Sequence, residues 1–476
     1  MNAWLSRYRP RYLRSLTYML QATEYDIGDY VEWYGRTRDF SRVEQRKSLV
    51  KTPKALVVLA LAWVIELGLL ALAVGLVWTD NVPFCRVLAL AVVIVAPFAT
   101  GYLLVVPLLV VRFLIQQPLE WLITRKSRKI LMQHPGLKIA VAGSFGKTSM
   151  REILRIVLAE GKRVAAPPHS YNTPLGISRF IRGLSGEEEV LIFELGEYYP
   201  GDVRKLCQLV NPQVGIITGV NEAHLGKFKS LDRTAATIFE LADWIGGGPI
   251  YVNGESDLAR KSARPGHLIY DRDGAGDWQV KNASTGLEGT KFTLTHGKEH
   301  LSISSHLLGL HQIGPLAAAA AVASSLGLTD RQIEAGLNAV TPFEHRMQPR
   351  TDSTGVTTLD DSYNGNPDGA RAVISFLGEI QDHRRFYVTP GLVEMGKRSA
   401  QVHREIGREL ARAGIERVVL IRDSATPFIA EALEAAHFKG EIMWYDDGPA
   451  AFAALPHLTV AGDVVLLQND WPDQYS

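Results

Sequence analysis

Residues 139–158 carry the pattern that most restricts how this chain can fold. A short apolar run, Ile139–Ala142, leads into Gly143-Ser-Phe-Gly-Lys-Thr148, and an apolar-periodic segment from Met150 to Leu158 follows at once. This order predicts a strand, a glycine loop and a helix. Such a loop directs backbone N–H groups, a lysine charge and a threonine hydroxyl towards a phosphate and its Mg²⁺. Val141 stands where the longer phosphate-loop pattern has its first glycine, so an ordinary turn is the alternative for this short form.

Two long apolar runs precede this loop. Residues 55–78 contain Glu66 as their only charge, and residues 87–111 form the second run. Each run has roughly 25 residues, enough for a helix to cross a hydrocarbon layer of about 30 Å. Arg and Lys flank the pair on both sides whereas the turn at residues 79–84 has neither, so both flanks are predicted to be cytoplasmic. We predict a transmembrane helical hairpin over residues 51–115 in the inner (cytoplasmic) membrane; a buried helical hairpin of a soluble protein is the alternative.

The segments on either side of the predicted hairpin have compositions that suit a membrane surface. Residues 1–50 mix arginine with tyrosine and tryptophan, which predicts a cytoplasmic amphipathic segment that contacts membrane lipids. A solvated, charge-rich helix pair is the alternative. Residues 116–136 indicate a basic connector helix that ends at His134-Pro135-Gly136. Glu66 is costly if it faces lipid, so we expect it to pair within the hairpin, to lie at an oligomer contact or to be protonated.

Charge and cysteine content exclude several classes of protein. With 51 Lys and Arg against 50 Asp and Glu, the net charge is +1, which argues against nucleic acid as a partner. The two cysteines, Cys85 and Cys207, lie in unlike contexts and cannot build a disulfide framework or a metal cluster. The soluble part therefore fits a reducing cytosol. A chain of 476 residues is also too long for one core, so several domains are expected.

After the connector, apolar strands alternate with helical segments, which predicts doubly wound, mostly parallel sheets. In a first α/β domain over residues 137–340, strands are expected at 138–142, 190–194 and 214–218, with an antiparallel extension over about 250–306. In a second α/β unit over residues 341–476, strands are expected at 357–360, 385–389, 417–421 and 463–467. The predicted fold class is therefore α/β, preceded by the two-helix hairpin.

Polar residues follow the predicted strands of the first domain. Glu194 closes the run from Val190, and because the carboxyl ends of parallel strands face the ligand crevice, its carboxylate is a candidate for holding Mg²⁺. A helix-capping or surface glutamate is the alternative. His224 follows the next strand in Asn221-Glu-Ala-His224, and Asn172 lies in a predicted turn. Taken singly, His224 and Asn172 would be ordinary structural residues.

Taken together, these motifs resemble the Mur ligases, ATP-dependent peptide-bond-forming enzymes of bacterial cell-wall precursors. The second unit agrees, with His345-Arg-Met-Gln-Pro349, Asp360-Asp-Ser-Tyr-Asn-Gly-Asn-Pro367, Glu394-Met-Gly396 and His403-Arg-Glu-Ile-Gly407. The chain is most similar to the type that adds D-alanyl-D-alanine to the UDP-MurNAc tripeptide (the MurF type). The resemblance covers roughly residues 137–476 and implies a P-loop ATP-binding central domain followed by a C-terminal Rossmann-like domain.

The resemblance also implies residue roles, with ATP and Mg²⁺ as cofactors. The implied catalytic residues are Lys147, Glu194, His224 and Arg346. The implied ATP-binding residues are Gly143, Ser144, Gly146, Lys147, Thr148, Ser149, Asn172, Gln312, Arg346 and Asp361. Thr148, Glu194 and His224 would hold the metal, and Tyr363, Asn364 and Asn366 would bind substrate. The implied reaction joins a carboxylate to an amine through an acyl phosphate, with a cell-wall precursor and an amino acid or dipeptide as substrates.

Several positions depart from the family pattern. A carbamylated lysine is expected two residues before Glu240, where this chain has Ile238, and the adenine-side motif reads His311-Gln312 with Pro315 in place of a second Asn. The predicted membrane hairpin stands in place of the domain that grips the UDP end of a soluble substrate, which suggests a lipid-linked substrate. There are two alternatives. The chain could carry out the same chemistry on a non-murein polymer or lipid, or it could be a degenerate nucleotide-binding partner subunit.

Overall fold

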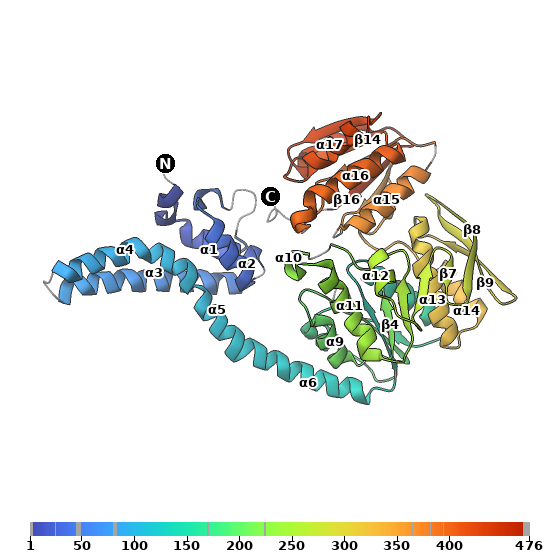
Figure 1. Ribbon diagram of the computed structural model, residues 1–476, viewed down its shortest axis with the longest axis horizontal. Coiled ribbons are helices and arrows are strands. Elements are labelled where there is room, and N and C mark those ends of the chain that lie inside the picture. The colour runs from blue at the N-terminus through green and yellow to red at the C-terminus, as the bar shows by residue number, and fades with distance from the viewer. Residues whose placement is uncertain are drawn as a thin grey trace. The chain divides into compact units, whose positions relative to one another are not determined.

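The computed structural model describes residues 3–23, 25–43, 49–79, 83–168, 171–222, 225–363, 365–380, 382–393 and 395–469. The described chain divides into two compact units, one ending at Leu122 and the other beginning at Ile123 (Figure 1). The division falls inside the predicted connector helix. Each unit has its own physical character and is described by itself.

Unit 1 is helical. Its two longest helices, α3 (Pro53–Thr79) and α4 (Pro83–Leu103), lie side by side as a hairpin (Figure 1). The chain continues from α4 through α5 (Val105–Val111), the π-helical turn η3 (Arg112–Gln116) and α6 (Gln117–Gln133). The two apolar runs and the connector are therefore confirmed as helices.

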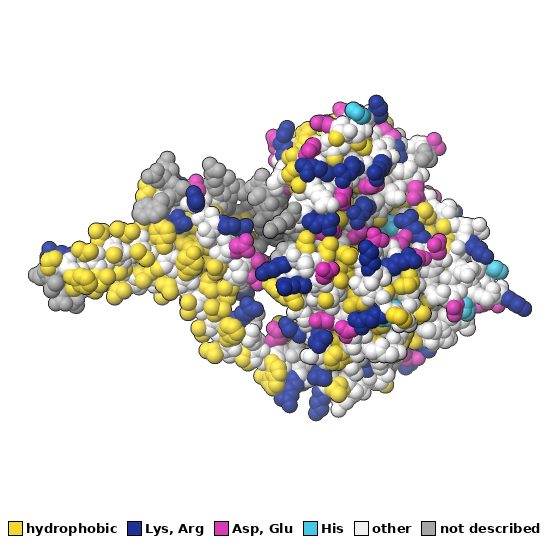
Figure 2. All heavy atoms as spheres, in the orientation of Figure 1, with side chains coloured by type: hydrophobic (Ala, Val, Ile, Leu, Met, Phe, Trp, Pro, Cys, Tyr) yellow, Lys and Arg dark blue, Asp and Glu magenta, His cyan; other side chains and the backbone are white. Residues whose placement is uncertain are grey.

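By length and composition, the helices over Pro53–Trp78 and Pro83–Gln133 could each cross a membrane, a test that core helices of soluble proteins also pass. Here only 17% and 39% of their most apolar windows are buried within the described chain. Figure 2 shows the exposed apolar side chains running along these helices. Packing against the rest of the described protein therefore does not account for their apolarity.

The N-terminal segment packs on the hairpin. It consists of η1 (Ala3–Tyr8), α1 (Tyr12–Ala22), α2 (Ile27–Arg36) and η2 (Phe40–Arg42). One hydrophobic cluster joins this segment to α3, to Leu104 just after α4, and to α5. It includes Tyr12, Leu13, Leu16, Leu20, Tyr30, Tyr34, Phe40, Val58, Ala62, Leu104 and Val105. The aromatic residues predicted to lie at lipid headgroups thus contribute in part to a shared core.

Tyrosine hydroxyls from this segment bond the backbone of α4 around Pro97, a residue that cannot donate a backbone hydrogen bond. The donor–acceptor pairs are Tyr8 to the Ile94 carbonyl at 2.6 Å, Tyr12 to Pro97 at 2.7 Å, Tyr34 to Phe98 at 3.2 Å and Tyr30 to Gly101 at 3.0 Å. Each phenol therefore finds an acceptor on the apolar helix, and polar groups so placed need a partner.

Glu66 also finds a partner inside the hairpin. The Thr100 hydroxyl of α4 donates to Glu66 Oε2 of α3 at 2.5 Å. This contact confirms the expectation that Glu66 pairs within the hairpin, and it fixes the register of the two helices at that level.

We predict that Gly101→Ala loosens the N-terminal segment from α4, because a Cβ at Gly101 would overlap the Tyr34 ring. In the detergent-solubilised protein, trypsin should then cleave the arginine-rich N-terminal segment several-fold faster than in the wild type. Gly75→Ala in α3 is the matched control, since nothing lies within 4 Å of a Cβ there. Equal cleavage of both variants would show that the Tyr34 contact does not hold the segment.

Unit 2 contains two α/β domains. The first is a ten-stranded sheet with the order β10-β9-β8-β7-β6-β5-β4-β1-β3-β2. Its parallel strands are β1 (Leu137–Ala142), β2 (Val164–Ala165), β3 (Val190–Glu194), β4 (Val214–Ile217), β5 (Ile250–Asn253) and β6 (Leu268–Asp271). The antiparallel strands are β7 (Gly274–Ala275), β8 (Trp278–Gly286), β9 (Gly289–His296) and β10 (Glu299–Ser305). The predicted extension is therefore present, but β5 and β6 still belong to the parallel part.

Helices cover both faces of this sheet, which gives two hydrophobic clusters. One cluster takes residues from α7 (Lys147–Ala159), α13 (Ile313–Ser325) and α14 (Asp330–Asn338). The other takes residues from α8 (Pro174–Ile181), α9 (Asp202–Val210), α11 (Leu231–Ile245) and α12 (Asp257–Ser262). The short helix α10 (Leu225–Phe228) precedes α11. The side chains of Thr329 and Gln332 form a capping box at the start of α14.

The second domain is a six-stranded sheet with the order β11-β12-β16-β13-β14-β15. Its strands are β11 (Gln348–Thr351), β12 (Thr357–Asp361), β13 (Arg385–Thr389), β14 (Arg417–Ile421), β15 (Glu441–Tyr445) and β16 (Val464–Gln468). All of these strands pair in parallel except β11, which pairs antiparallel with β12. Helices α15 (Pro367–Glu379), α16 (Ser399–Ala413), α17 (Thr426–Ala435) and α18 (Gly448–Leu458) complete the domain. The predicted doubly wound α/β class is confirmed.

Candidate active site

The glycine loop connects β1 to α7 and is braced by the end of β4. Gly143 and Gly146 have φ values of +147° and +73°, and a Cβ on Gly143 would collide with Thr218 Oγ1. The Ser144 N–H donates to the Gly219 carbonyl at 2.9 Å, and the Thr218 hydroxyl donates to the Phe145 carbonyl. The predicted strand, loop and helix are therefore confirmed, with the loop at the N-terminus of α7.

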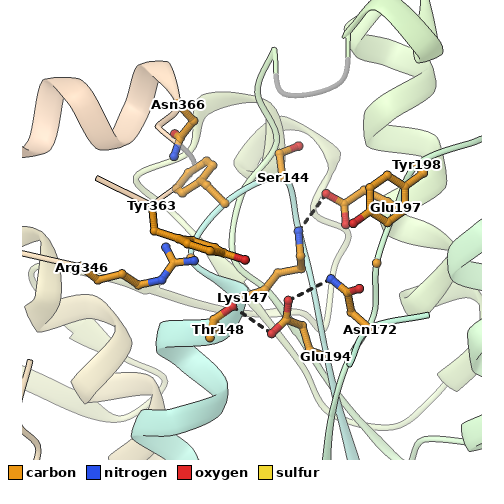
Figure 3. A pocket seen from close by; sticks show the side chains of 13 residues that line it. Ser144, Lys147, Thr148, Asn172, Glu194, Glu197, Tyr198, Arg346, Tyr363 and Asn366 are labelled. Carbon is orange, nitrogen blue, oxygen red and sulfur yellow. Dashed lines mark hydrogen bonds and ion pairs between the residues drawn. The ribbon is translucent and has the colours of Figure 1, made fainter. Parts of the chain in front are cut away.

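Lys147 is held over this loop by two acceptors. Its Nζ donates to the Gly143 carbonyl at 2.5 Å and to Glu197 Oε1 at 2.9 Å (Figure 3). The Lys147 side chain is 13% exposed and that of Glu197 only 2%. The phosphate-loop lysine, Lys147, is therefore held in a largely buried ion pair with Glu197.

Glu194, at the end of β3, is buried and accepts hydrogen bonds from three sides. Thr148 Oγ1 donates at 3.0 Å, Asn172 Nδ2 at 3.2 Å and Arg151 Nη1 at 3.4 Å. The Thr148 hydroxyl and the Glu194 carboxylate are hard oxygen donors next to a phosphate loop, the donor set that Mg²⁺ prefers. The residues present therefore fit a magnesium ion.

The second domain contributes Arg346 to the same place. The Arg346 guanidinium lies 5.1 Å from the centroid of the Tyr363 ring. Arg346 lies between His345 and Met347, whose φ values are +57° and +49°. Such positive values are unfavourable for residues other than glycine. His345 Nδ1 lies 2.7 Å from Asp360 Oδ2, which supports this conformation. Such backbone strain is typical of functional sites.

Three polar contacts, made by Asn221 and Glu222, join the second domain to the loop after β4. Asn221 Nδ2 donates to Asn366 Oδ1 at 2.9 Å and to Asp368 Oδ2 at 2.8 Å, at the N-terminus of α15. Arg398 forms an ion pair with Glu222. The residues that follow Glu222 include His224, so the segment predicted to reach the metal also contacts the second domain.

Two adjoining cavities lie between the domains. A polar cavity of about 100 Å³ is lined by Ser144, Phe145, Gly146, Lys147, Thr148, Asn172, Glu194, Gly196, Glu197, Tyr198, Arg346, Tyr363 and Asn366. A larger cavity of about 450 Å³ is lined by residues that include Ser149, Asn253, Glu255, Tyr270, Arg272, His311, Gln312, Pro315, Phe343, Asp361 and Arg371. Phe145, Gly146, Arg346, Tyr363 and Asn366 line both cavities, so a phosphate chain and a nucleoside can be held end to end.

Burial shifts the protonation of two groups in the larger cavity. Burial and the nearby charge of Arg272 lower the pKa of His311 to about 4, so this imidazole is neutral at physiological pH. Its Nε2 lies 2.9 Å from Gln312 Nε2, which fits a neutral ring that accepts from the amide. Burial raises the pKa of Asp361 to about 7, against the opposing charge of Arg346. Arg272 is paired with Glu255 at 2.5 Å.

Most of the predicted site residues come together in these cavities. Ser144, Gly146, Lys147, Thr148, Ser149, Asn172, Glu194, Gln312, Arg346, Asp361, Tyr363 and Asn366 all line one cavity or the other. Gly143 lines neither of them and contributes its carbonyl to Lys147. His224 and Asn364 lie outside the described residues. The individual roles implied by the resemblance stay predictions.

Ile238, where the family pattern has a carbamylated lysine, lies in a hydrophobic environment. Ile238 is completely buried in the hydrophobic cluster of α9 and α11, and the nearby Glu240 accepts a hydrogen bond from the Arg204 N–H at 2.9 Å. Neither side chain lines the two cavities. Among the described residues, which do not include His224, no group of three His, Cys, Asp or Glu side chains is arranged to hold a metal.

The sequence interpretation missed Glu197, Tyr198 and the larger-cavity pair Glu255 and Arg272. Glu197 lies three residues after Glu194, and the rule that strand ends face the ligand crevice could have identified it. Glu255 and Arg272 follow β5 and β6, which the sequence pattern predicts as part of the antiparallel extension, and the rule concerns the ends of parallel strands.

Comparisons with known proteins agree with this geometry. The family model for the Mur ligase middle domain matches residues 141–323, and the model for the Mur ligase, glutamate ligase domain matches residues 345–468. The UDP-N-acetylmuramoyl-tripeptide–D-alanyl-D-alanine ligase of Mycobacterium tuberculosis is 31% identical over 354 residues, covering 69% of each chain. The enzyme of the same name from Bacillus subtilis is 24% identical over 344 residues, covering 71% of this chain and 74% of its own.

Solved structures show the same fold. The MurF ligase from Thermotoga maritima in complex with ADP superposes with a TM-score of 0.65 at 24% identity, covering 74% of this chain and 80% of its own. A MurF structure from Acinetobacter baumannii gives a TM-score of 0.64 at 22% identity, covering 74% and 77%.

A lysine-bearing phosphate loop that shares its cavity with an arginine from a second α/β domain, together with these matches, defines an ATP-dependent peptide ligase. The chain belongs to the Mur ligase family.

We predict that Asp361→Asn stabilises the nucleotide-free protein at alkaline pH. Because burial raises the pKa of Asp361 to about 7, the stabilising effect of its protonated form is full below about pH 4 and is lost as the pH rises towards 7. Asparagine removes this cost, so its advantage in free energy of unfolding should grow between pH 4 and 7 to about 4 kcal/mol and then level off. Thermal unfolding of both proteins from pH 4 to 8 measures this advantage. A difference in unfolding free energy that does not change with pH would contradict the prediction.

Proposed function

We propose that this protein is a membrane-anchored ligase that uses ATP to join an amino acid or dipeptide to the carboxylate of a cell-wall muropeptide precursor. One observation carries the proposal: Lys147, Glu194 and Arg346, from two domains, line a single polar cavity. The mycobacterial relative is named for a UDP-N-acetylmuramoyl tripeptide and D-alanyl-D-alanine, which supports a precursor of that class.

The chemistry requires activation of a poor electrophile. A carboxylate oxygen of the precursor attacks the γ-phosphorus of ATP, ADP leaves, and the carboxylate becomes an acyl phosphate that an amine can displace. Lys147 and Arg346 supply positive charge next to the transferring phosphoryl group, and the loop amides orient it. The chain therefore contributes positioning and charge rather than a covalent nucleophile.

Thr148 and Glu194, with His224 as a predicted third ligand, would hold Mg²⁺ beside the phosphates. When bound, the ion neutralises phosphate charge. The contacts of Asn221 and Glu222 with the second domain keep the cavity closed, which limits hydrolysis of the acyl phosphate by water.

The proposed anchor is the hairpin of α3 and α4. Its apolar side chains are largely exposed along two helices long enough to cross a bilayer (Figure 2). The family match begins at residue 141, after these helices. A ligase held at the cytoplasmic membrane face acts most readily on a precursor that is itself membrane-bound, so the preferred carboxylate substrate is a lipid-linked muropeptide.

A purified-protein assay of phosphate release tests this function. Release should require ATP, a muropeptide with a free carboxylate, and D-alanyl-D-alanine together, and it should be faster with the lipid-linked muropeptide than with the UDP-linked one. Equal rates with both forms would remove the lipid-linked substrate from the proposal. ATP binding without consumption for any pair of substrates would favour the nucleotide-binding partner subunit.

We predict that Lys147→Met lowers substrate-dependent phosphate release about 10²–10³-fold, because the charge next to the transferring phosphoryl group is lost. Lys205→Met is the matched control, since Lys205 is exposed on α9 and pairs only with Asp202 among the ion pairs of the described chain. The control should keep wild-type turnover. Comparable loss in both variants would contradict a role for Lys147 in catalysis.

A further inference from the structure

Glu197 is a buried carboxylate that already holds an ammonium group. Its Oε1 accepts from Lys147 Nζ at 2.9 Å, and its side chain is 2% exposed. It lines the polar cavity together with Tyr198 (Figure 3). The cavity therefore contains a carboxylate placed to pair with a primary ammonium.

Glu194, the other carboxylate that lines the polar cavity, has different hydrogen-bond partners. Glu194 accepts from Thr148, Asn172 and Arg151 and is the residue suited to the magnesium ion. Among the described residues that line this cavity, Glu194 and Glu197 are the carboxylates. Glu197 is thus the carboxylate of this cavity that pairs with a primary ammonium group.

The proposed ligation needs such a group. The acceptor amine arrives as an ammonium ion at neutral pH, since free α-amino groups titrate near pH 8, and an ammonium nitrogen has no lone pair for attack. It must reach the acyl carbon next to the former γ-phosphate, which places it in the polar cavity. A positioned carboxylate can both bind the ammonium and take its proton.

We propose that Glu197 is the residue that binds the ammonium of the amine substrate and accepts its first proton. This inference rests on the proposed function. When ATP enters, Lys147 turns its charge to the phosphates, and Glu197 exchanges the lysine ammonium for that of the substrate. The ligand class is a primary amine of an amino acid or short peptide.

Amide formation from an ammonium requires two proton transfers. The R–NH₃⁺ group gives one proton to the Glu197 carboxylate, and the freed nitrogen lone pair forms a bond to the acyl carbon. The bond from that carbon to the phosphate oxygen breaks, and the phosphate leaves with the electron pair. The second nitrogen proton passes to the departing phosphate, and Glu197 releases its proton to solvent. Acyl phosphate and ammonium thus give amide, hydrogen phosphate and one proton.

The test uses Glu197→Gln in the full chain, with ATP and the muropeptide that the wild type consumes. Hydroxylamine, which is uncharged at neutral pH, traps the acyl phosphate as a hydroxamate without an ammonium. We expect kcat/KM for D-alanyl-D-alanine to fall about 100-fold at pH 7 while hydroxamate formation stays within tenfold of the wild type. The deficit in kcat/KM should shrink above about pH 8, because the amine substrate is then largely unprotonated and needs no base. Glu197→Asp should recover part of the loss.

Glu187→Gln is the matched control, because Glu187 is exposed and lies outside both cavities. If Glu197→Gln instead raises KM for ATP and lowers hydroxamate formation to the same degree, Glu197 only positions Lys147 and the inference is overturned. If Glu197→Gln instead loses one bound Mn²⁺ per nucleotide, counted by electron paramagnetic resonance, Glu197 is a metal ligand. That result would also overturn the inference. A wild type that forms no hydroxamate would refute the proposed function itself.

Discussion

The position of β1 between β3 and β4 is the constraint on which the site depends. Parallel pairing sets Val141 opposite Glu194 and Ala142 opposite Ile217. The three strands therefore end at the same level, which brings together the glycine loop, the Glu194 carboxylate and the Thr218–Gly219 brace. A shift of one residue would turn Glu194 to the other face of the sheet. The buried strand cores are thus what give the charged cavity its geometry.

Much of this could be predicted because the relevant signals are local. The bounds of β3 follow from a continuous apolar run, and the glycine loop has its own spacing. Strands β11 and β15 were missed because each lies at a sheet edge, where one side needs no partner and polar residues such as Gln348 or Glu441 are tolerated. The strand-end rule places Glu197 near the ligand crevice, but its contact with Lys147, fifty positions earlier in the chain, follows only from the fold.

The N-terminal segment gives a similar lesson. Arginine and tyrosine in an apolar context predict contact with lipid headgroups, and this interpretation uses composition alone. In the structure, Tyr12 and Tyr34 donate to the carbonyls of Pro97 and Phe98 in α4, where an intramolecular acceptor replaces water or headgroups. Composition could not distinguish the two outcomes, because the acceptors belong to a helix some sixty to eighty-five residues away.

The central claim is that ATP activates a carboxylate as an acyl phosphate before the amine attacks. Positional isotope transfer tests it most directly. With ¹⁸O in both oxygens of the muropeptide carboxylate, mass spectrometry of the inorganic phosphate formed in one turnover should show one ¹⁸O atom per phosphate, because the carboxylate oxygen leaves with it. Phosphate that contains no ¹⁸O would mean that water, not the carboxylate, attacks ATP, and would contradict formation of an acyl phosphate in this cavity.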